Sequence, residues 1–171
     1  MTEGVTLVLG GARSGKSAFA ESLVQAAGGA IYLATAEAGD GEMARRIAAH
    51  QARRGAGWSL IEEPIFIADR LAELSARGTD RPVLIDCLTL WLSNILLAER
   101  DVKADIEWLR LQLAETGPAI VLVSGEVGAG IVPDNALARA YRDHVGLMNQ
   151  EFAGLARTVY LVTAGIAQKL K

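Results

Sequence analysis

The chain has 171 residues and a formal charge of −3, from 17 basic and 20 acidic side chains. This balance excludes an overall positive field that would attract nucleic acid or an anionic membrane surface, so any phosphate site must be local. Apolar residues make up 51% of the chain and aromatic residues only 5%, which predicts a single α/β domain over residues 1–171 with an interior of Ala, Val, Leu and Ile.

Strand and helix patterns alternate along the chain. In order they predict a strand at 5–9, a helix at 16–27, a strand at 30–35, a helix at 42–54, a short strand at 58–62, a helix at 65–76, a strand at 82–86, helices at 88–97 and 104–114, a strand at 119–124, a helix at 135–155 and a strand at 158–163. Helical crossovers of this length imply parallel strands joined right-handedly, with ligands at their carboxyl ends.

A glycine-rich segment follows the first strand and opens the first helix. Its residues match the pattern G-x-x-x-x-G-K-S: Gly10, Gly11, Ala12, Arg13, Ser14, Gly15, Lys16 and Ser17. In such a P-loop, backbone N–H groups surround phosphate oxygens, the lysine adds positive charge, and the serine hydroxyl can bind Mg²⁺. The alternative is a strand-to-helix turn that binds nothing, which the strand before it and the helix after it disfavour.

A carboxylate, Asp86, closes the apolar strand at 82–86. P-loop folds place a carboxylate at this point to orient the magnesium ion and its waters, so Asp86 and Ser17 are the expected metal-binding residues. The same position also suits an N-cap for the helix that begins at Leu88, and one aspartate could serve both roles.

His50 lies among four arginines in the polar segment 42–54. Neutral imidazole is a competent nucleophile toward phosphorus, and neighbouring guanidinium groups would lower its pKa and stabilise a transferred phosphoryl group. Taken alone, the pattern is explained better by an ordinary surface histidine. Glu126, beyond the strand at 119–124, is evenly open between a ligand contact and a turn.

The lone Cys87 rules out an internal disulfide and a metal cluster of several cysteines. We expect a cytoplasmic protein, because the first nine residues do not have the pattern of a signal peptide and no span has the ~20 apolar residues that a membrane helix requires.

With these residues in view, the chain resembles the bifunctional adenosylcobinamide kinase / adenosylcobinamide-phosphate guanylyltransferase family of cobalamin (vitamin B12) biosynthesis, nearly end to end. The motifs that carry the resemblance are Gly10 to Ser17, Tyr32 to Ala36, Asp40 to His50, Glu62-Glu63-Pro64, Leu84 to Trp91, Glu126 to Pro133, Asn135 to Arg139, Arg142-Asp143 and Asn149-Gln150.

The resemblance implies two reactions: phosphorylation of adenosylcobinamide with ATP or GTP, then transfer of GMP from GTP to the new phosphate, which gives adenosylcobinamide-GDP. Family members carry out the second step through a guanylylated histidine, and His50 stands at the matching position. The resemblance also implies a RecA-like P-loop fold, a mostly parallel sheet flanked by helices, and a homotrimer.

Further nucleotide contacts follow from the resemblance alone. They are Ala34, Thr35, Ala36, Gln51, Ala52, Arg53, Arg54, Glu62 and Asp86, besides the P-loop from Gly10 to Ser17 with its catalytic Lys16. The chain departs from many relatives in Ile65-Phe66-Ile67 and in a tail, Gly165-Ile166-Ala167, that lacks their common proline. We expect neither segment to touch the phosphate chemistry.

Two other functions remain open from the sequence. One is a kinase of another small molecule in which His50 binds substrate without covalent modification. The other is a non-catalytic, nucleotide-responsive regulator, which is disfavoured because no Asn-Lys-x-Asp motif for reading guanine occurs in the chain.

Overall fold

The computed structural model describes residues 4–36, 57–115 and 117–171. In this part the strands are β1 (Val5–Gly10), β2 (Ile31–Ala34), β3 (Ser59–Glu62), β4 (Val83–Asp86), β5 (Ile120–Gly125), β6 (Thr158–Thr163) and β7 (Ile166–Lys169). The helices are α1 (Lys16–Gln25), α3 (Ile67–Ala76), α4 (Leu88–Leu97), α5 (Val102–Glu115) and α6 (Ala136–Leu155). The predicted helix at 42–54 lies outside the described residues.

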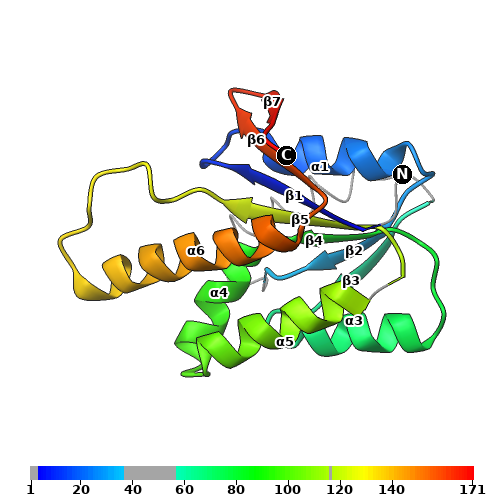
Figure 1. Cartoon of the computed structure of the whole chain (residues 1–171), viewed down its shortest axis with the longest axis horizontal. Helices are drawn as coiled ribbons and strands as arrows, with labels where there is room; N and C mark the ends of the chain where they lie inside the picture. Colours follow the sequence, from blue (N-terminus) through cyan, green and yellow to red (C-terminus); the bar gives the residue numbers. More distant parts are fainter. Residues whose placement is uncertain (1–3, 37–56, 116) are drawn as a thin grey trace.

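The strands form one sheet in the order β3-β2-β4-β5-β1-β6-β7 (Figure 1). Every pairing is parallel except that of β6 with β7. The predicted α/β class and mostly parallel sheet are therefore confirmed. Because β4, β5 and β1 are neighbours and pair in parallel, their carboxyl ends are gathered at one edge of the sheet.

The terminal strand β7 was not predicted, since the sequence pattern was interpreted as ending with the strand at 158–163. Thr163 pairs with Ile166, so only Ala164 and Gly165 connect β6 to β7. Both have positive φ, 51° and 79°, as a tight hairpin turn of this length requires. Ala-Gly is not the Asn-Gly or Asp-Gly pair that signals such a turn, which is why the hairpin was missed.

Both faces of the sheet are buried, and successive strand residues alternate between them. Leu7 and Ile85 belong to the larger core beneath α3, α4, α5 and α6, whereas Val8 and Leu84 belong to the smaller core beneath α1 (Figure 1). This double burial explains why the central strands are continuous apolar runs rather than alternating ones. It also means that every second residue of a strand points toward α1 and the loop before it.

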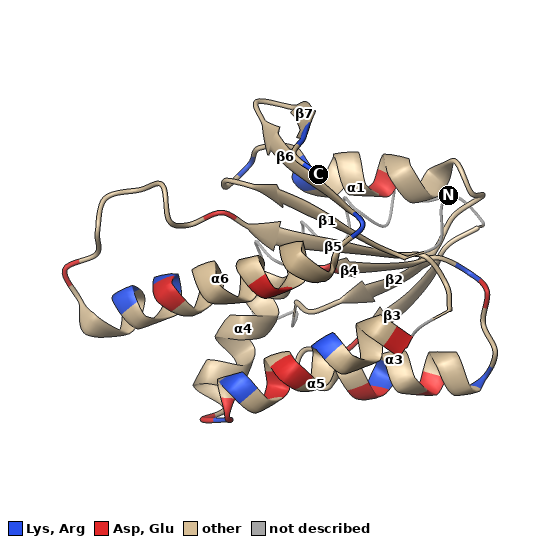
Figure 2. Cartoon of the chain, viewed as in Figure 1, with Lys and Arg blue, Asp and Glu red and all other residues tan. Residues whose placement is uncertain are grey.

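Charged side chains lie mainly on the helices and on the connecting loops, and the strands carry few of them (Figure 2). Among the described residues, no helix is both long and apolar enough to cross a membrane.

Candidate functional site

The predicted P-loop is a tight turn between β1 and α1. The amide of Ser14 donates to the carbonyl of Gly11 at 3.3 Å, and Gly15 then precedes the first residue of α1. The ammonium group of Lys16 folds back over the turn and donates to the same Gly11 carbonyl at 3.1 Å. The strand, turn and helix on which the phosphate-binding prediction depends are thus present, with the lysine charge over the loop.

Two positions of this loop require glycine. A Cβ atom on Gly10 would lie 2.4 Å from Oγ of Ser14 and 2.6 Å from the backbone oxygen of Val162. Gly15 has a φ of 96°, in the left-handed region, and a Cβ there would approach Cα of Gly165 to 3.2 Å. The glycine spacing in the sequence therefore reflects close contact between the loop and the β6–β7 hairpin.

The hairpin turn is bonded to the P-loop directly, because the amide of Gly165 donates to the carbonyl of Ser14 at 2.8 Å. The tail at Gly165 therefore contacts the backbone of the P-loop, and the expectation that it does not touch the phosphate chemistry stays a prediction. The turn at Ala164-Gly165 follows β6, and β6 pairs with β1, so the turn lies beside the loop that follows β1.

Asp86 ends β4 on the face of the sheet that α1 covers, because it lies two residues after Leu84 on the same strand. Its Oδ2 accepts a hydrogen bond of 2.9 Å from the hydroxyl of Tyr32. The alternative role as an N-cap is wrong: Cys87 is the N-cap residue of α4, and no side chain caps that helix. The strand continues through Asp86, so its carboxylate points across the sheet rather than along the helix.

Strand register brings three of the predicted nucleotide contacts together. Ala34 pairs with Glu62 on one side and with Asp86 on the other, so the three residues form a row at the carboxyl edge. Glu62 is exposed at the end of the edge strand, and Ala36 is half-buried just beyond β2.

Thr35 lies beside this row and is fully buried. Its hydroxyl donates to the carbonyl of Cys87 and accepts from the Cys87 amide, both at 2.8 Å. The side-chain amide of Asn94 donates to the Thr35 carbonyl, also at 2.8 Å. The side chain of Thr35 therefore joins the ends of β2 and β4, and its role as a nucleotide contact stays a prediction.

A polar cluster at the end of β5 was not predicted as part of the site, although Thr89 and Asn149 lie in motifs that carry the family resemblance. The Gly125 amide donates to Thr89 on α4 at 3.3 Å, and its carbonyl accepts from the Asn149 amide group on α6 at 3.1 Å. Asn149 also accepts a 2.7 Å bond from the buried hydroxyl of Ser124. Since Gly125 pairs with Gly10, these side chains fix the backbone beside the P-loop.

Cys87 adjoins the same cluster, with its Sγ 3.2 Å from Oγ1 of Thr89. Burial raises the pKa of this thiol, the negative charge of Asp86 raises it further, and the charge of Lys16 lowers it by a smaller amount. The thiol is therefore protonated at neutral pH, as expected of a packing residue rather than a nucleophile.

Glu126 follows the cluster and is exposed, with its amide bonded to the Gly10 carbonyl at 3.0 Å. Its carboxylate accepts from the amide of Gly128, so the side chain stabilises a turn of the loop that follows β5. The predicted site residues His50, Gln51, Ala52, Arg53 and Arg54 lie outside the described residues.

Oxygen donors suited to magnesium are present at this edge. Ser17 lies on the first turn of α1, which follows β1. Asp86 ends β4, which is separated from β1 in the sheet by β5 alone. In the described part of the chain, no group of three or more His, Cys, Asp or Glu side chains is placed to hold a metal ion. One carboxylate and one hydroxyl fit a cation that takes its other ligands from phosphates and water, which is how Mg²⁺ is usually bound.

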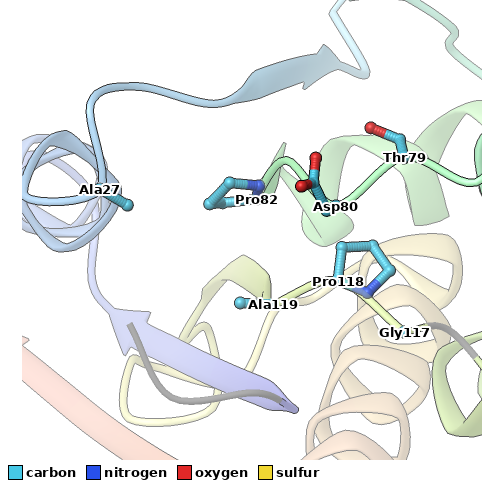
Figure 3. A pocket seen from close by; sticks show the side chains of 7 residues that line it. All are labelled: Ala27, Thr79, Asp80, Pro82, Gly117, Pro118 and Ala119. Atoms are coloured by element: carbon cyan, nitrogen blue, oxygen red, sulfur yellow. The ribbon is translucent and has the colours of Figure 1, made fainter.

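A cavity of about 480 Å³ lies at the opposite end of the sheet. Figure 3 shows the side chains that line it. Its walls include Ala27 after α1, Pro82 before β4 and Ala119 before β5. These residues lie before the amino ends of β2, β4 and β5, away from the P-loop. The cavity is also lined by Thr79 and Asp80, but the P-loop, Lys16 and Asp86 lie at the carboxyl edge, and we therefore take that edge as the candidate site.

Comparisons with known proteins identify the family and the fold. Residues 6–170 match the family model described as cobinamide kinase / cobinamide phosphate guanyltransferase. The chain is 47% identical over 168 residues to the bifunctional adenosylcobalamin biosynthesis protein CobP of Pseudomonas aeruginosa, covering 96% of each chain. It is 37% identical over 185 residues to the corresponding protein CobU of Salmonella typhimurium, covering 96% of this chain and 98% of that one.

The fold is similar to that of an ATPase from the type III secretion system of pathogenic bacteria. The two structures superpose with a TM-score of 0.59 at 12% identity, over 97% of this chain and 56% of the other. This likeness confirms the predicted RecA-like P-loop architecture.

Proposed function

Because the chain belongs to the cobinamide kinase / cobinamide phosphate guanyltransferase family, we propose that it phosphorylates adenosylcobinamide with ATP or GTP and then transfers GMP from GTP to adenosylcobinamide phosphate. The observation that carries the proposal is the glycine loop at the end of β1, with Lys16 folded over it and Asp86 at the same edge of the sheet. Adenosylcobinamide-GDP is the final product.

In the kinase step, the P-loop amides and Lys16 hold the triphosphate and neutralise charge on the group being transferred. The hydroxyl oxygen of adenosylcobinamide attacks the γ-phosphorus, the nucleoside diphosphate leaves, and the hydroxyl proton passes to solvent. The contact between the loop and the β6–β7 hairpin supports this role, because a braced loop keeps its amides directed at the phosphates.

In the guanylyl transfer, the imidazole of His50 attacks the α-phosphorus of GTP and pyrophosphate leaves, so that a phosphoramidate forms. A phosphate oxygen of adenosylcobinamide phosphate then displaces the histidine. The four arginines in the segment around His50 would offset the negative charge on the phosphorus. Gln51, Ala52, Arg53 and Arg54, with Ala34, Thr35, Ala36 and Glu62, complete the nucleotide contacts of the proposal.

We assign Ser17 and Asp86 to a magnesium ion that binds with the nucleotide. When bound, the ion supplies positive charge to the phosphate oxygens. The protein's part is to hold one hydroxyl and one carboxylate at the edge where the phosphates lie. We place the reaction in the cytoplasm, where nucleoside triphosphates are available.

A homotrimer belongs to the same proposal. The family resemblance implies it, and three large apolar side chains are exposed: Leu97 at the end of α4, Ile131 before α6 and Leu137 in its first turn, with exposed fractions of 76%, 98% and 69%. Leu97 and Leu137 line the same hollow. An apolar surface of this kind is typical of protein contacts. Sedimentation equilibrium measures the state, and a monomer at micromolar concentration would contradict it.

The test of the activity uses GTP labelled on the α-phosphate, Mg²⁺ and adenosylcobinamide, with products identified by mass. The parent protein should yield adenosylcobinamide phosphate and then adenosylcobinamide-GDP, and should carry acid-labile GMP when the corrinoid is omitted. His50→Ala should lose the label and the GDP product while it still forms the phosphate.

His144→Ala is the matched control, because it removes the chain's other histidine, which is half-buried on α6. This variant should keep both reactions. Labelling of His50→Ala would show that the histidine assignment is wrong, and formation of phosphate alone by the parent would leave only a kinase.

A further inference from the structure

Tyr32 is a buried tyrosine whose hydroxyl reaches the functional edge. Its side chain is 6% exposed and packs in the core beneath α1 together with Leu84. Tyr32 pairs with Leu84 across β2 and β4, and Asp86 lies two residues further on the same face of β4. The length of the phenol ring spans this step, so the hydroxyl meets Oδ2 of Asp86 at 2.9 Å.

The hydroxyl fixes the rotation of a carboxylate that would otherwise turn freely about its last bond. A carboxylate at a metal site is usually hydrogen-bonded itself, and its partner sets the direction of the oxygens. The phenol holds Oδ2, and within the described part of the chain no hydrogen bond to Oδ1 is present, so Oδ1 is the oxygen we expect to face a cation or its waters. The ring is also held in place, since Trp58 lies 6.3 Å from it between centroids at an angle of 58°.

We propose that Tyr32 is a positioning residue for the metal-binding carboxylate of Asp86. The inference rests on the proposed function, which assigns Asp86 to the nucleotide-bound cation. Few protein ligands are expected to contact that cation, so the orientation of one carboxylate determines much of its affinity. A tyrosine that only filled the core would have no effect specific to the metal.

The experiment measures the affinity of Mn²⁺ for the complex of the protein with a non-hydrolysable GTP analogue, from the electron paramagnetic resonance signal of free Mn²⁺. Tyr32→Phe keeps the ring and removes the hydroxyl, and it should weaken Mn²⁺ binding by roughly tenfold, the lower end of the effect of losing such a partner. The affinity for the analogue without metal should stay at the parent value.

Tyr160→Phe is the matched control. It removes a phenol hydroxyl from β6 on the same protein, where the ring packs against Phe19 at 5.0 Å. Its Mn²⁺ affinity should equal that of the parent. In an Asp86→Asn background, Tyr32→Phe should have no further effect, because the two side chains act as one unit.

Parent-like Mn²⁺ affinity in Tyr32→Phe would overturn the inference, and so would an equal loss of metal-free analogue binding, which would indicate a structural defect alone. A separate outcome concerns the proposed function: if Asp86→Asn itself leaves Mn²⁺ affinity unchanged, the metal assignment of Asp86 fails. If Asp86→Asn weakens binding and Tyr32→Phe does not, only the role of Tyr32 is lost.

Discussion

Asn149 offers a direct test of how α6 supports the functional edge. Its side chain is only 6% exposed, and it makes two hydrogen bonds to the end of β5. It accepts from Oγ of Ser124 at 2.7 Å and donates to the carbonyl of Gly125 at 3.1 Å. Ser124 and Gly125 pair with Leu9 and Gly10, so the asparagine holds the backbone next to the P-loop.

Asn149→Ala removes the acceptor of the Ser124 hydroxyl and the donor to the Gly125 carbonyl, so both buried groups lose a hydrogen bond. Each group left unsatisfied costs about 1–3 kcal/mol, and the hydroxyl of Ser124 can rotate toward another acceptor, so we expect a loss of about 2–4 kcal/mol in the free energy of unfolding. Nucleotide affinity should fall as well, because the loop loses a support on the β5 side.

Urea unfolding at a fixed protein concentration measures the change, which keeps any contribution from subunit association constant. Gln150→Ala is the control, since the neighbouring side chain is exposed and its loss should stay within about 0.5 kcal/mol. Asn149→Leu fills the space without the hydrogen bonds and should remain destabilised. A loss below about 1 kcal/mol in Asn149→Ala would refute the reasoning.

Three further outcomes are expected. Gly10→Ala places a Cβ 2.6 Å from the backbone oxygen of Val162, so β1 must move away from β6. We expect weaker binding of a fluorescent GTP analogue and a loss of about 1–3 kcal/mol in the free energy of unfolding, measured in urea. Parent-like binding would show that the loop can adjust. Ala164→Asn should stabilise the protein by about 0.5–1 kcal/mol, because asparagine tolerates the φ of 51° better than alanine does. The midpoint of thermal unfolding checks this, and a lower midpoint would contradict it. Burial, and secondarily the charge of Cys87, raises the pKa of Tyr141 from 10.0 to about 12. As pH rises, the phenol of Tyr141 ionises first in the unfolded chain. Its contribution to the free energy of unfolding is therefore fully present below about pH 10 and is lost as pH rises to about 12. Unfolding followed over that range should show a shallower decline in Tyr141→Phe than in the parent, and equal slopes would count against the shift.

Much of the site was visible in the sequence because its parts are local. The P-loop is eight consecutive residues, so its pattern can be recognised in the sequence, although the contacts that require glycine at Gly10 and Gly15 are made partly with the distant β6–β7 hairpin. The apolar run before Asp86 predicted a strand, and the position of Asp86 at its end predicted a carboxylate at the carboxyl edge of the sheet. Alternation of strand and helix patterns likewise indicated a parallel sheet, since each crossover helix is itself a local feature.

What the sequence left open depends on which distant segments become neighbours. The strand order sets Ala34 between Glu62 and Asp86, and no periodicity along the chain encodes that register. The bond from Tyr32 to Asp86 joins residues 54 apart, and the Gly165 turn meets Ser14 only because β6 lies beside β1. The sequence by itself determined which chemical groups are present and on which strand, helix or loop each one lies, because those patterns are local. Tertiary packing decided which of those groups touch, because hydrogen bonds between separate strands depend on distances in space that no single segment specifies.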